Sequence, residues 1–222
     1  MNFSTYLQQA FESQCLPEPL YQKFSIFHHN YVEAALKKSS LETAEALCLQ
    51  WLKVVIEDLK NPFIFPPYHR KIRSPVDLFH FGIEFFSLLI DDENSRVLNI
   101  DQLNVIQEYI SRGDNVILLA NHQTECDPQL MYYALRKKHP KLIENMIFVA
   151  GDRLTSDPLA RPFSMGCDLL CIYSKRHIAS SRHTTARELT NCIAEIHRVS
   201  DGSLRKDRHP ARTSRRILRH DG

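Results

Sequence analysis

The stretch ANHQTECDP at 120–128 holds three side chains that can transfer protons or bind metals: His122, Glu125 and Asp127. It follows the apolar run NVILLA at 115–120. A carboxylate that accepts the Nδ1 proton of an imidazole fixes the ring tautomer and leaves Nε2 available as a base. Because a turn can bring two side chains at this spacing together, His122 and Asp127 are candidates for a general base and its orienting acid.

Two other interpretations of this stretch stay open from the residues alone. Asp127 stands directly before Pro128, a pairing typical of a helix start, where a carboxylate caps the unpaired backbone amides. His122 would then be an exposed loop residue. The third interpretation is a metal site formed by His122, Glu125 and Asp127. A single histidine without a second ligand pair at a usual spacing disfavours it, so we predict no metal.

A second cluster, Lys175, Arg176 and His177, lies in YSKRHI. Consecutive cationic groups suit a phosphate, and the planar guanidinium matches phosphate oxygens best. A solvated basic strand end would give the same pattern. The functional interpretation is favoured because this cluster and the 120–128 stretch are both expected at one edge of a sheet.

That expectation comes from the alternation of short apolar runs with helical patterns after about residue 100. Such alternation predicts βαβ units around a mainly parallel sheet, in which ligands bind beyond the carboxyl ends of the strands. The polar stretches NHQTECD, GDR and KRH each follow one expected strand. We expect strands at 115–120, 145–150 and 168–174, and helices at 100–114 and 128–139.

The N-terminal part is predicted to be helical. Ser39 stands three residues before Glu42, as in a capping box, and opens an amphipathic pattern that ends at Asn61-Pro62. Ser74 and Pro75 are expected to cap and begin a further helix. The buried face of the long helix is predicted to contain Leu47, Trp51, Val54, Val55 and Leu59.

The fold class predicted is α/β, with a small helical bundle followed by an incomplete α/β domain. The boundaries expected are 1–73 for the helical domain and its proline-rich connector, 74–177 for the α/β domain, and 178–222 for an atypical basic tail. This tail carries ten Lys or Arg against five Asp or Glu, and none of the 21 aromatic residues. It is expected to form one helix at most.

Composition points to a cytoplasmic protein. The net charge is +2, and the six cysteines include no C-x-x-C pair, so reduced thiols are expected. The N-terminus has no targeting pattern. The most apolar window, 76–90, is too short to span a bilayer and contains charged residues. Nucleic acid is not an expected partner, because no aromatic residues interleave the arginines of the tail.

Three segments together resemble the soluble glycerol-3-phosphate acyltransferases of plastids and of some bacteria related to chlamydiae. They are NPFIFPPYHRKIRSPVDLFHFG, NVILLANHQTECDPQL and ENMIFVAGDRLTSDPLARPFSMGCDLLCIYSKRHI, and they lie within about residues 60–177. The most specific parts are NHQTE-DP and FVAGDR…DPL…PFS-G…YSK-H. The resemblance implies a helical N-terminal domain followed by an α/β domain, and an enzyme that makes 1-acylglycerol 3-phosphate.

The resemblance also implies residue roles. His122 and Asp127 fall on the H-x-x-x-x-D pair, in which the histidine deprotonates the sn-1 hydroxyl of glycerol 3-phosphate and the aspartate orients it. Arg176 and His177 are implied phosphate ligands, with Lys175 and Arg153 as further candidates. The acyl donor would be acyl carrier protein or acyl-CoA, with no cofactor, and peripheral membrane contact is expected.

The resemblance stops after His177, where the family pattern of a further strand and an arginine-containing loop is absent. We therefore expect a truncated or frame-shifted product of low activity. The alternative function is a non-catalytic remnant that binds acyl carrier protein or an anionic membrane surface.

Overall fold

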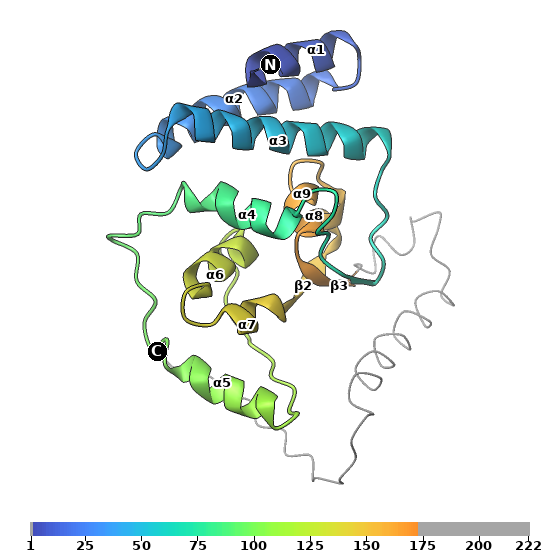
Figure 1. Cartoon of the computed structure of the whole chain (residues 1–222). Coiled ribbons are helices and arrows are strands. Elements are labelled where there is room, and N and C mark those ends of the chain that lie inside the picture. Colours follow the sequence, from blue (N-terminus) through green and yellow to red (C-terminus); the bar gives the residue numbers. More distant parts are fainter. Residues whose placement is uncertain (1, 173–222) are drawn as a thin grey trace, which may run out of the picture. The chain divides into compact units, whose positions relative to one another are not determined.

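The computed structural model describes residues 2–172 (Figure 1). The chain divides into two compact units. The first unit comprises 1–96 and 124–174, and the second comprises 97–123 and 175–222. The predicted boundaries at residues 73 and 177 stay predictions. The predicted sites at 175–177 and the predicted tail lie outside the described residues.

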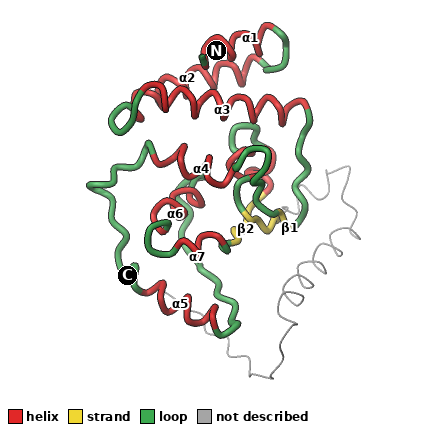
Figure 2. The backbone as a smooth tube through the Cα atoms, in the orientation of Figure 1, coloured by secondary structure: helices red, strands yellow, loops and turns green. Residues whose placement is uncertain are grey.

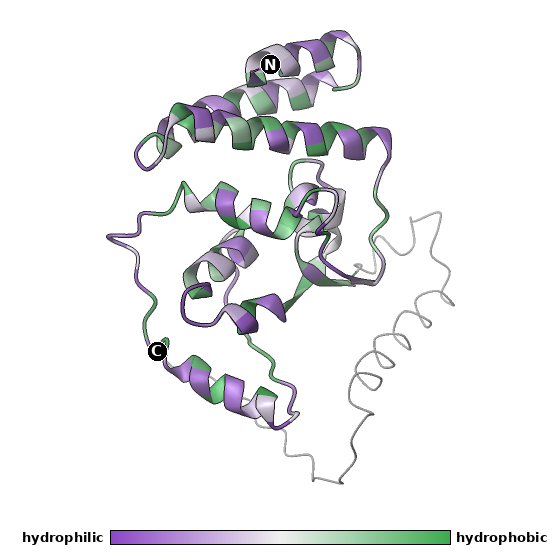
Figure 3. Ribbon diagram, viewed as in Figure 1, coloured by the Kyte–Doolittle hydropathy of each residue, from purple (hydrophilic) through white to green (hydrophobic). Residues whose placement is uncertain are grey.

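Helices α1 (Phe3–Glu12), α2 (Glu18–Ala35) and α3 (Leu41–Lys60) pack together in the first unit (Figure 1). Figure 3 shows hydrophobic and hydrophilic residues alternating along α3, as an amphipathic helix requires. Trp51 is buried, and its ring lies 4.5 Å from that of Phe24 and 5.6 Å from that of Phe85. Of the predicted face of α3, Leu47, Trp51 and Val55 are buried, whereas Val54 and Leu59 are half-buried.

Two predicted helix starts are wrong in detail. The N-cap of α3 is Ser40 rather than Ser39, and its hydroxyl accepts a hydrogen bond from the Thr43 amide at 3.1 Å. Helix α4 (Leu78–Ser87) is capped by Asp77 rather than Ser74, because the Asp77 carboxylate accepts from the His80 amide at 3.0 Å. In both cases several capping residues stand close together, and only the folded backbone decides between them.

The sheet has three strands within the described residues, in the order β1-β3-β2. Strands β2 (Ile147–Gly151) and β3 (Asp168–Ile172) are parallel, which confirms the two expected strands and their orientation. Strand β1 (Tyr68–His69) comes from the proline-rich connector and pairs antiparallel with β3. Its two residues gave no alternating pattern, so it was missed. Figure 2 shows how small the sheet is beside the helices.

Among the described residues, four further helices belong to the first unit. They are α6 (Asp127–Leu135), α7 (Pro140–Glu144), α8 (Asp152–Ser156) and α9 (Arg161–Met165). Of these, α8 contacts both β2 and β3. Helix α4 packs on both α6 and α9, and α3 also contacts α9. The mixed α/β fold class is thus confirmed. None of the helices in residues 2–172 is both long and apolar enough to cross a bilayer.

The described part of the second unit holds helix α5 (Gln102–Ser111), which confirms the helix expected there. Gly113 follows it at a φ of +87°, a conformation that glycine adopts without strain. The strand expected at 115–120 is not formed. Ile117 is 84% exposed and Leu119 is 79% exposed. A strand needs a hydrogen-bonded neighbour, and among residues 2–172 none pairs with this run, so its apolar composition alone misled the prediction.

Candidate active site

The site begins at the first turn of α6. Cys126, and not Asp127, occupies the N-cap position, and Pro128 follows Asp127 within the first turn. The amide of Thr124, which precedes the helix, donates to Asp127 Oδ1 at 3.2 Å. Asp127 is therefore the first helical residue, and its carboxylate binds the backbone three residues before it.

Glu125 in this stretch contacts a residue that follows β2. Arg153, in α8, places Nη1 3.6 Å from Glu125 Oε1. The sequence GDR comes directly after a strand, as expected, because α8 begins at the residue after Gly151. Arg153 is one of the residues predicted to bind phosphate, and it lies beside Glu125.

His122 lies in the second unit, in the exposed segment at 114–123 that follows α5, whereas Asp127 lies in the first. Lys175, Arg176 and His177 lie outside the described residues. Their roles stay predictions.

Within 2–172, no group of three or more His, Cys, Asp or Glu side chains is arranged as metal ligands would be. The five cysteines in that range are free thiols. Burial raises the pKa of the Cys48 thiol to about 12, so it is a core residue rather than a nucleophile.

A buried polar cluster behind α6 was not expected from the sequence. Gln129, two residues after Asp127, donates through Nε2 to the Phe163 carbonyl at 3.1 Å and to Cys167 Sγ at 3.4 Å. Cys167 is fully enclosed, and burial raises the pKa of its thiol to about 12. The signal that could have revealed the cluster is the single polar residue among the apolar positions of the α6 pattern.

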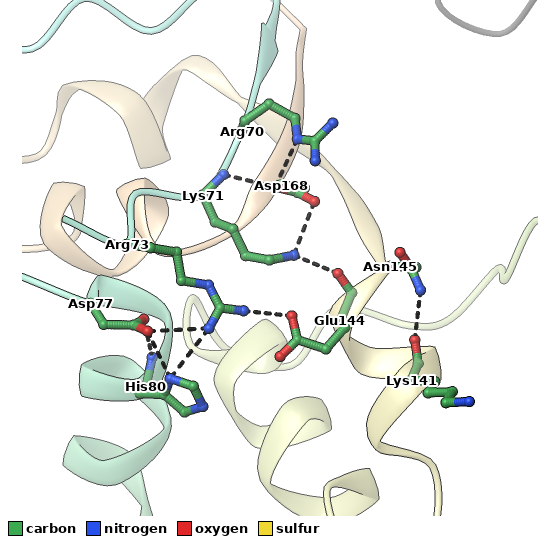
Figure 4. Close-up of polar contacts among 9 residues, drawn as sticks. All are labelled: Arg70, Lys71, Arg73, Asp77, His80, Lys141, Glu144, Asn145 and Asp168. Carbon is green, nitrogen blue, oxygen red and sulfur yellow. Dashed lines mark hydrogen bonds and ion pairs between the residues drawn. The ribbon is translucent and has the colours of Figure 1, made fainter. Parts of the chain in front are cut away.

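A second polar network lies at the amino end of β3 and was also missed (Figure 4). The Lys71 amide donates to Asp168 Oδ1 at 2.7 Å, and its Nζ lies 3.0 Å from Asp168 Oδ2. Arg73 extends this network to the end of α7, where its Nη2 donates to Oε2 of Glu144 at 2.5 Å. The network ties the connector to the sheet and to α7. It lies at the opposite end of β3 from the carboxyl end, where ligands of parallel sheets bind, so we assign it a structural role.

Comparison with known proteins supplies the family. Residues 102–199 match the family model described as Acyltransferase. A glycerol-3-phosphate acyltransferase, chloroplastic, of Spinacia oleracea is 40% identical over 162 residues, which are 71% of this chain and 34% of that protein. The protein of the same name from Carthamus tinctorius is 39% identical over 176 residues, covering 78% of this chain and 38% of its own.

A third relative, the glycerol-3-phosphate acyltransferase, chloroplastic, of Arabidopsis thaliana, is 34% identical over 176 residues, which are 78% of this chain and 38% of that protein. The chain thus spans between a third and two-fifths of the length of these relatives. The matched family segment includes the whole 120–128 stretch and Arg153. Residues 102–199 therefore contain a segment of the Acyltransferase family, and more than two thirds of the chain is similar to glycerol-3-phosphate acyltransferases.

Proposed function

We propose that this chain transfers a fatty acyl group from a thioester donor to the sn-1 hydroxyl of glycerol 3-phosphate, giving 1-acylglycerol 3-phosphate for phospholipid synthesis. The donor is acyl carrier protein or acyl-CoA. The single observation that supports the proposal is the contact between Arg153 and Glu125, because it brings a candidate cation for the substrate phosphate beside the residues that lead into Asp127. The names of the relatives supply the substrate.

In the proposed reaction, Nε2 of His122 accepts the proton of the sn-1 hydroxyl while that oxygen attacks the thioester carbonyl. The carbon–sulfur bond then breaks, and the thiolate that leaves takes the proton from the imidazolium. Asp127 holds the Nδ1 proton and stabilises the positive ring. A positioned base of this kind contributes roughly a hundred- to ten-thousandfold in rate, or about 3–5 kcal/mol of barrier.

The phosphate of the substrate is held by Arg176 and His177, with Lys175 and Arg153 as further cations. The charge of this group does not change during the reaction, so these residues bind substrate and transition state equally. We propose a cytoplasmic location with peripheral membrane contact. The free thiols of the described cysteines support a reducing compartment.

The test is acyl transfer by the 222-residue chain, with radiolabelled glycerol 3-phosphate and acyl carrier protein or CoA thioesters. His122→Ala is expected to abolish product, whereas His29→Ala, at an exposed position of α2, is the control and leaves turnover unchanged. Equal turnover of His122→Ala and the unmodified chain would remove His122 from the mechanism. Salt-sensitive binding of acyl carrier protein or anionic vesicles without product would favour the non-catalytic alternative.

A further inference from the structure

Gln129 is a buried polar residue in the turn of α6 that carries Asp127. The residue is 3% exposed, and its side-chain amide nitrogen donates to the Phe163 carbonyl and to Cys167 Sγ. Cys167 also donates to the Phe163 carbonyl, at 3.4 Å. These bonds connect the first turn of α6 to the junction between α9 and β3.

The junction between α9 and β3 is closely packed. The ring of Phe163 lies among the aromatic rings of the core, 5.1 Å from that of Phe85. A Cβ at Gly166 would lie 2.4 Å from the Leu78 carbonyl, so α4 and the end of α9 approach as closely as glycine allows. A Cβ at Gly82 would lie 3.2 Å from Gln129 Cγ, so the glutamine fills the space beside α4.

Packing alone does not explain a glutamine at this position. Burying an amide costs free energy unless its polar atoms are paired, and an apolar side chain of similar volume would fill the space without that cost. Gln129 Oε1 is buried with no hydrogen-bond partner within the described residues. The residue therefore keeps two directional bonds at the expense of an unsatisfied acceptor.

We propose that Gln129 is a positioning residue for Asp127 in the proposed acyl transfer. Asp127 and Gln129 share one helical turn, and the Asp127 carboxylate already fixes the Thr124 amide before the helix. The bonds of Gln129 hold that turn against α9 and β3, and so fix the position of the carboxylate that is proposed to accept the Nδ1 proton of His122. A displacement of about 1 Å at such a site costs about a hundredfold in rate. The inference rests on the proposed roles of His122 and Asp127.

The test reads the His122 tautomer by ¹⁵N NMR of the full chain with labelled histidine, so it does not require turnover. His122→Ala identifies the resonances. In the unmodified chain the neutral ring is expected to carry its proton on Nδ1, where Asp127 accepts it. Gln129→Met, which conserves volume but cannot donate, is expected to lower the ratio of the Nδ1–H to the Nε2–H form about fivefold, the scale of one lost hydrogen bond.

Leu135→Met is the matched control, because Leu135 is buried two turns further along α6 and the substitution conserves volume without removing a polar group. It is expected to leave the ratio unchanged. Gly82→Ala keeps both amide bonds but displaces Gln129 by a few tenths of an ångström. Gly82→Ala therefore replaces Gln129→Met as the test variant if Gln129→Met does not fold. It is expected to lower the ratio of the Nδ1–H to the Nε2–H form by a smaller factor.

The outcomes separate this inference from the proposed function. An unchanged ratio in folded Gln129→Met, or in Gly82→Ala if the first variant does not fold, overturns the role of Gln129. A tautomer shift in a chain whose acyl transfer survives His122→Ala would support the positioning role and overturn the proposed chemistry. An unmodified chain without a preference for Nδ1–H overturns both.

Discussion

The guanidinium of Arg153 lies 3.6 Å from the carboxylate of Glu125, and this contact joins the residues that follow β2 to the stretch that precedes α6. Both side chains are largely open to solvent, with 80% and 46% exposed. Exposed ion pairs contribute about 0–1 kcal/mol to stability, so this contact adds little to the fold. Its consequence is to orient a cation beside the proposed catalytic stretch.

Arg153→Gln is therefore expected to affect binding and not folding. The free energy of unfolding should change by less than about 0.5 kcal/mol, as for other exposed pairs. In the transfer assay, the KM for glycerol 3-phosphate should rise while kcat stays constant, because the phosphate charge does not change during the reaction. Urea unfolding and initial-rate kinetics measure the two effects. A lower kcat at saturating substrate would contradict the binding role.

The buried ion pair between Arg161 and Asp58 is expected to contribute more to the free energy of unfolding than an exposed pair does. Arg161, in α9, and Asp58, in α3, have side chains that are 12% and 7% exposed, and Nη2 of the arginine lies 2.9 Å from Oδ1 of the aspartate. Arg161→Met would leave the Asp58 carboxylate buried beside the Phe63 amide without its cation. The variant is expected to lose about 3–5 kcal/mol of unfolding free energy in urea titrations.

The control for Arg161→Met is Arg112→Met, which removes an ion pair with Glu108 whose side chains are both 65% exposed. It should cost at most about 0.5 kcal/mol. Equal losses in the two variants would show that burial does not govern the Arg161 pair.

The sequence predicted those features that local periodicity and short motifs encode. Leu47, Trp51 and Val55 repeat at helical spacing, and the structure buries all three. The apolar runs around Val149 and Leu170 became parallel strands in register with each other. Arg153 was expected beyond the end of a strand and lies there, beside Glu125.

Features that depend on long-range contacts were not predictable. The run around Ile117 is as apolar as the other two, but a strand also requires a partner edge, which no local pattern reveals. The bonds of Gln129 to Phe163 and Cys167 connect residues 34 and 38 positions apart. Lys71 and Asp168 are separated by 97 positions. Such pairs follow from topology rather than spacing.

His69 is expected to make the stability of the fold depend on pH. It is buried, and its Nε2 lies 3.1 Å from the Met165 carbonyl. Burial lowers the pKa of His69, although the bond to Met165 and the charge of Asp168 oppose this effect. The unfolded chain therefore binds a proton at higher pH than the folded chain does, and stability decreases as pH falls below about 6.5.

His69→Gln tests this dependence, because glutamine can still donate to the Met165 carbonyl but does not titrate. We expect the unfolding free energy of the variant to decrease less than that of the unmodified chain between pH 7 and pH 5. Urea titrations across this range measure it. Parallel curves for the two chains would assign the acid sensitivity to other groups.

Asp77 is expected to stabilise α4 through a cap whose strength depends on its charge. Its Oδ1 accepts from the His80 amide, and its Oδ2 lies 2.8 Å from His80 Nδ1 and 3.1 Å from Arg73 Nη1. Partial desolvation opposes the effect, but the bonds from His80 and Arg73 lower the pKa of the Asp77 carboxyl. Its contribution is thus complete above about pH 4, the ordinary range of aspartate, and is lost as pH falls further.

Asp77→Ala should cost about 1 kcal/mol at pH 7, the usual effect of a lost cap, whereas Asp77→Asn keeps an acceptor for the amide and should cost less. Asp101→Ala is the matched control, because Asp101 stands at the N-cap of α5 without a side-chain bond to the helix. Urea unfolding at pH 7 and pH 3 measures all three variants. The difference between the unmodified chain and Asp77→Asn should shrink at pH 3, because the Asp77 carboxyl of the unfolded chain is then largely protonated whereas the lowered pKa of the folded chain resists protonation. A loss in Asp101→Ala equal to that in Asp77→Ala would mean that the observed bond to the His80 amide is not the source of the stabilisation.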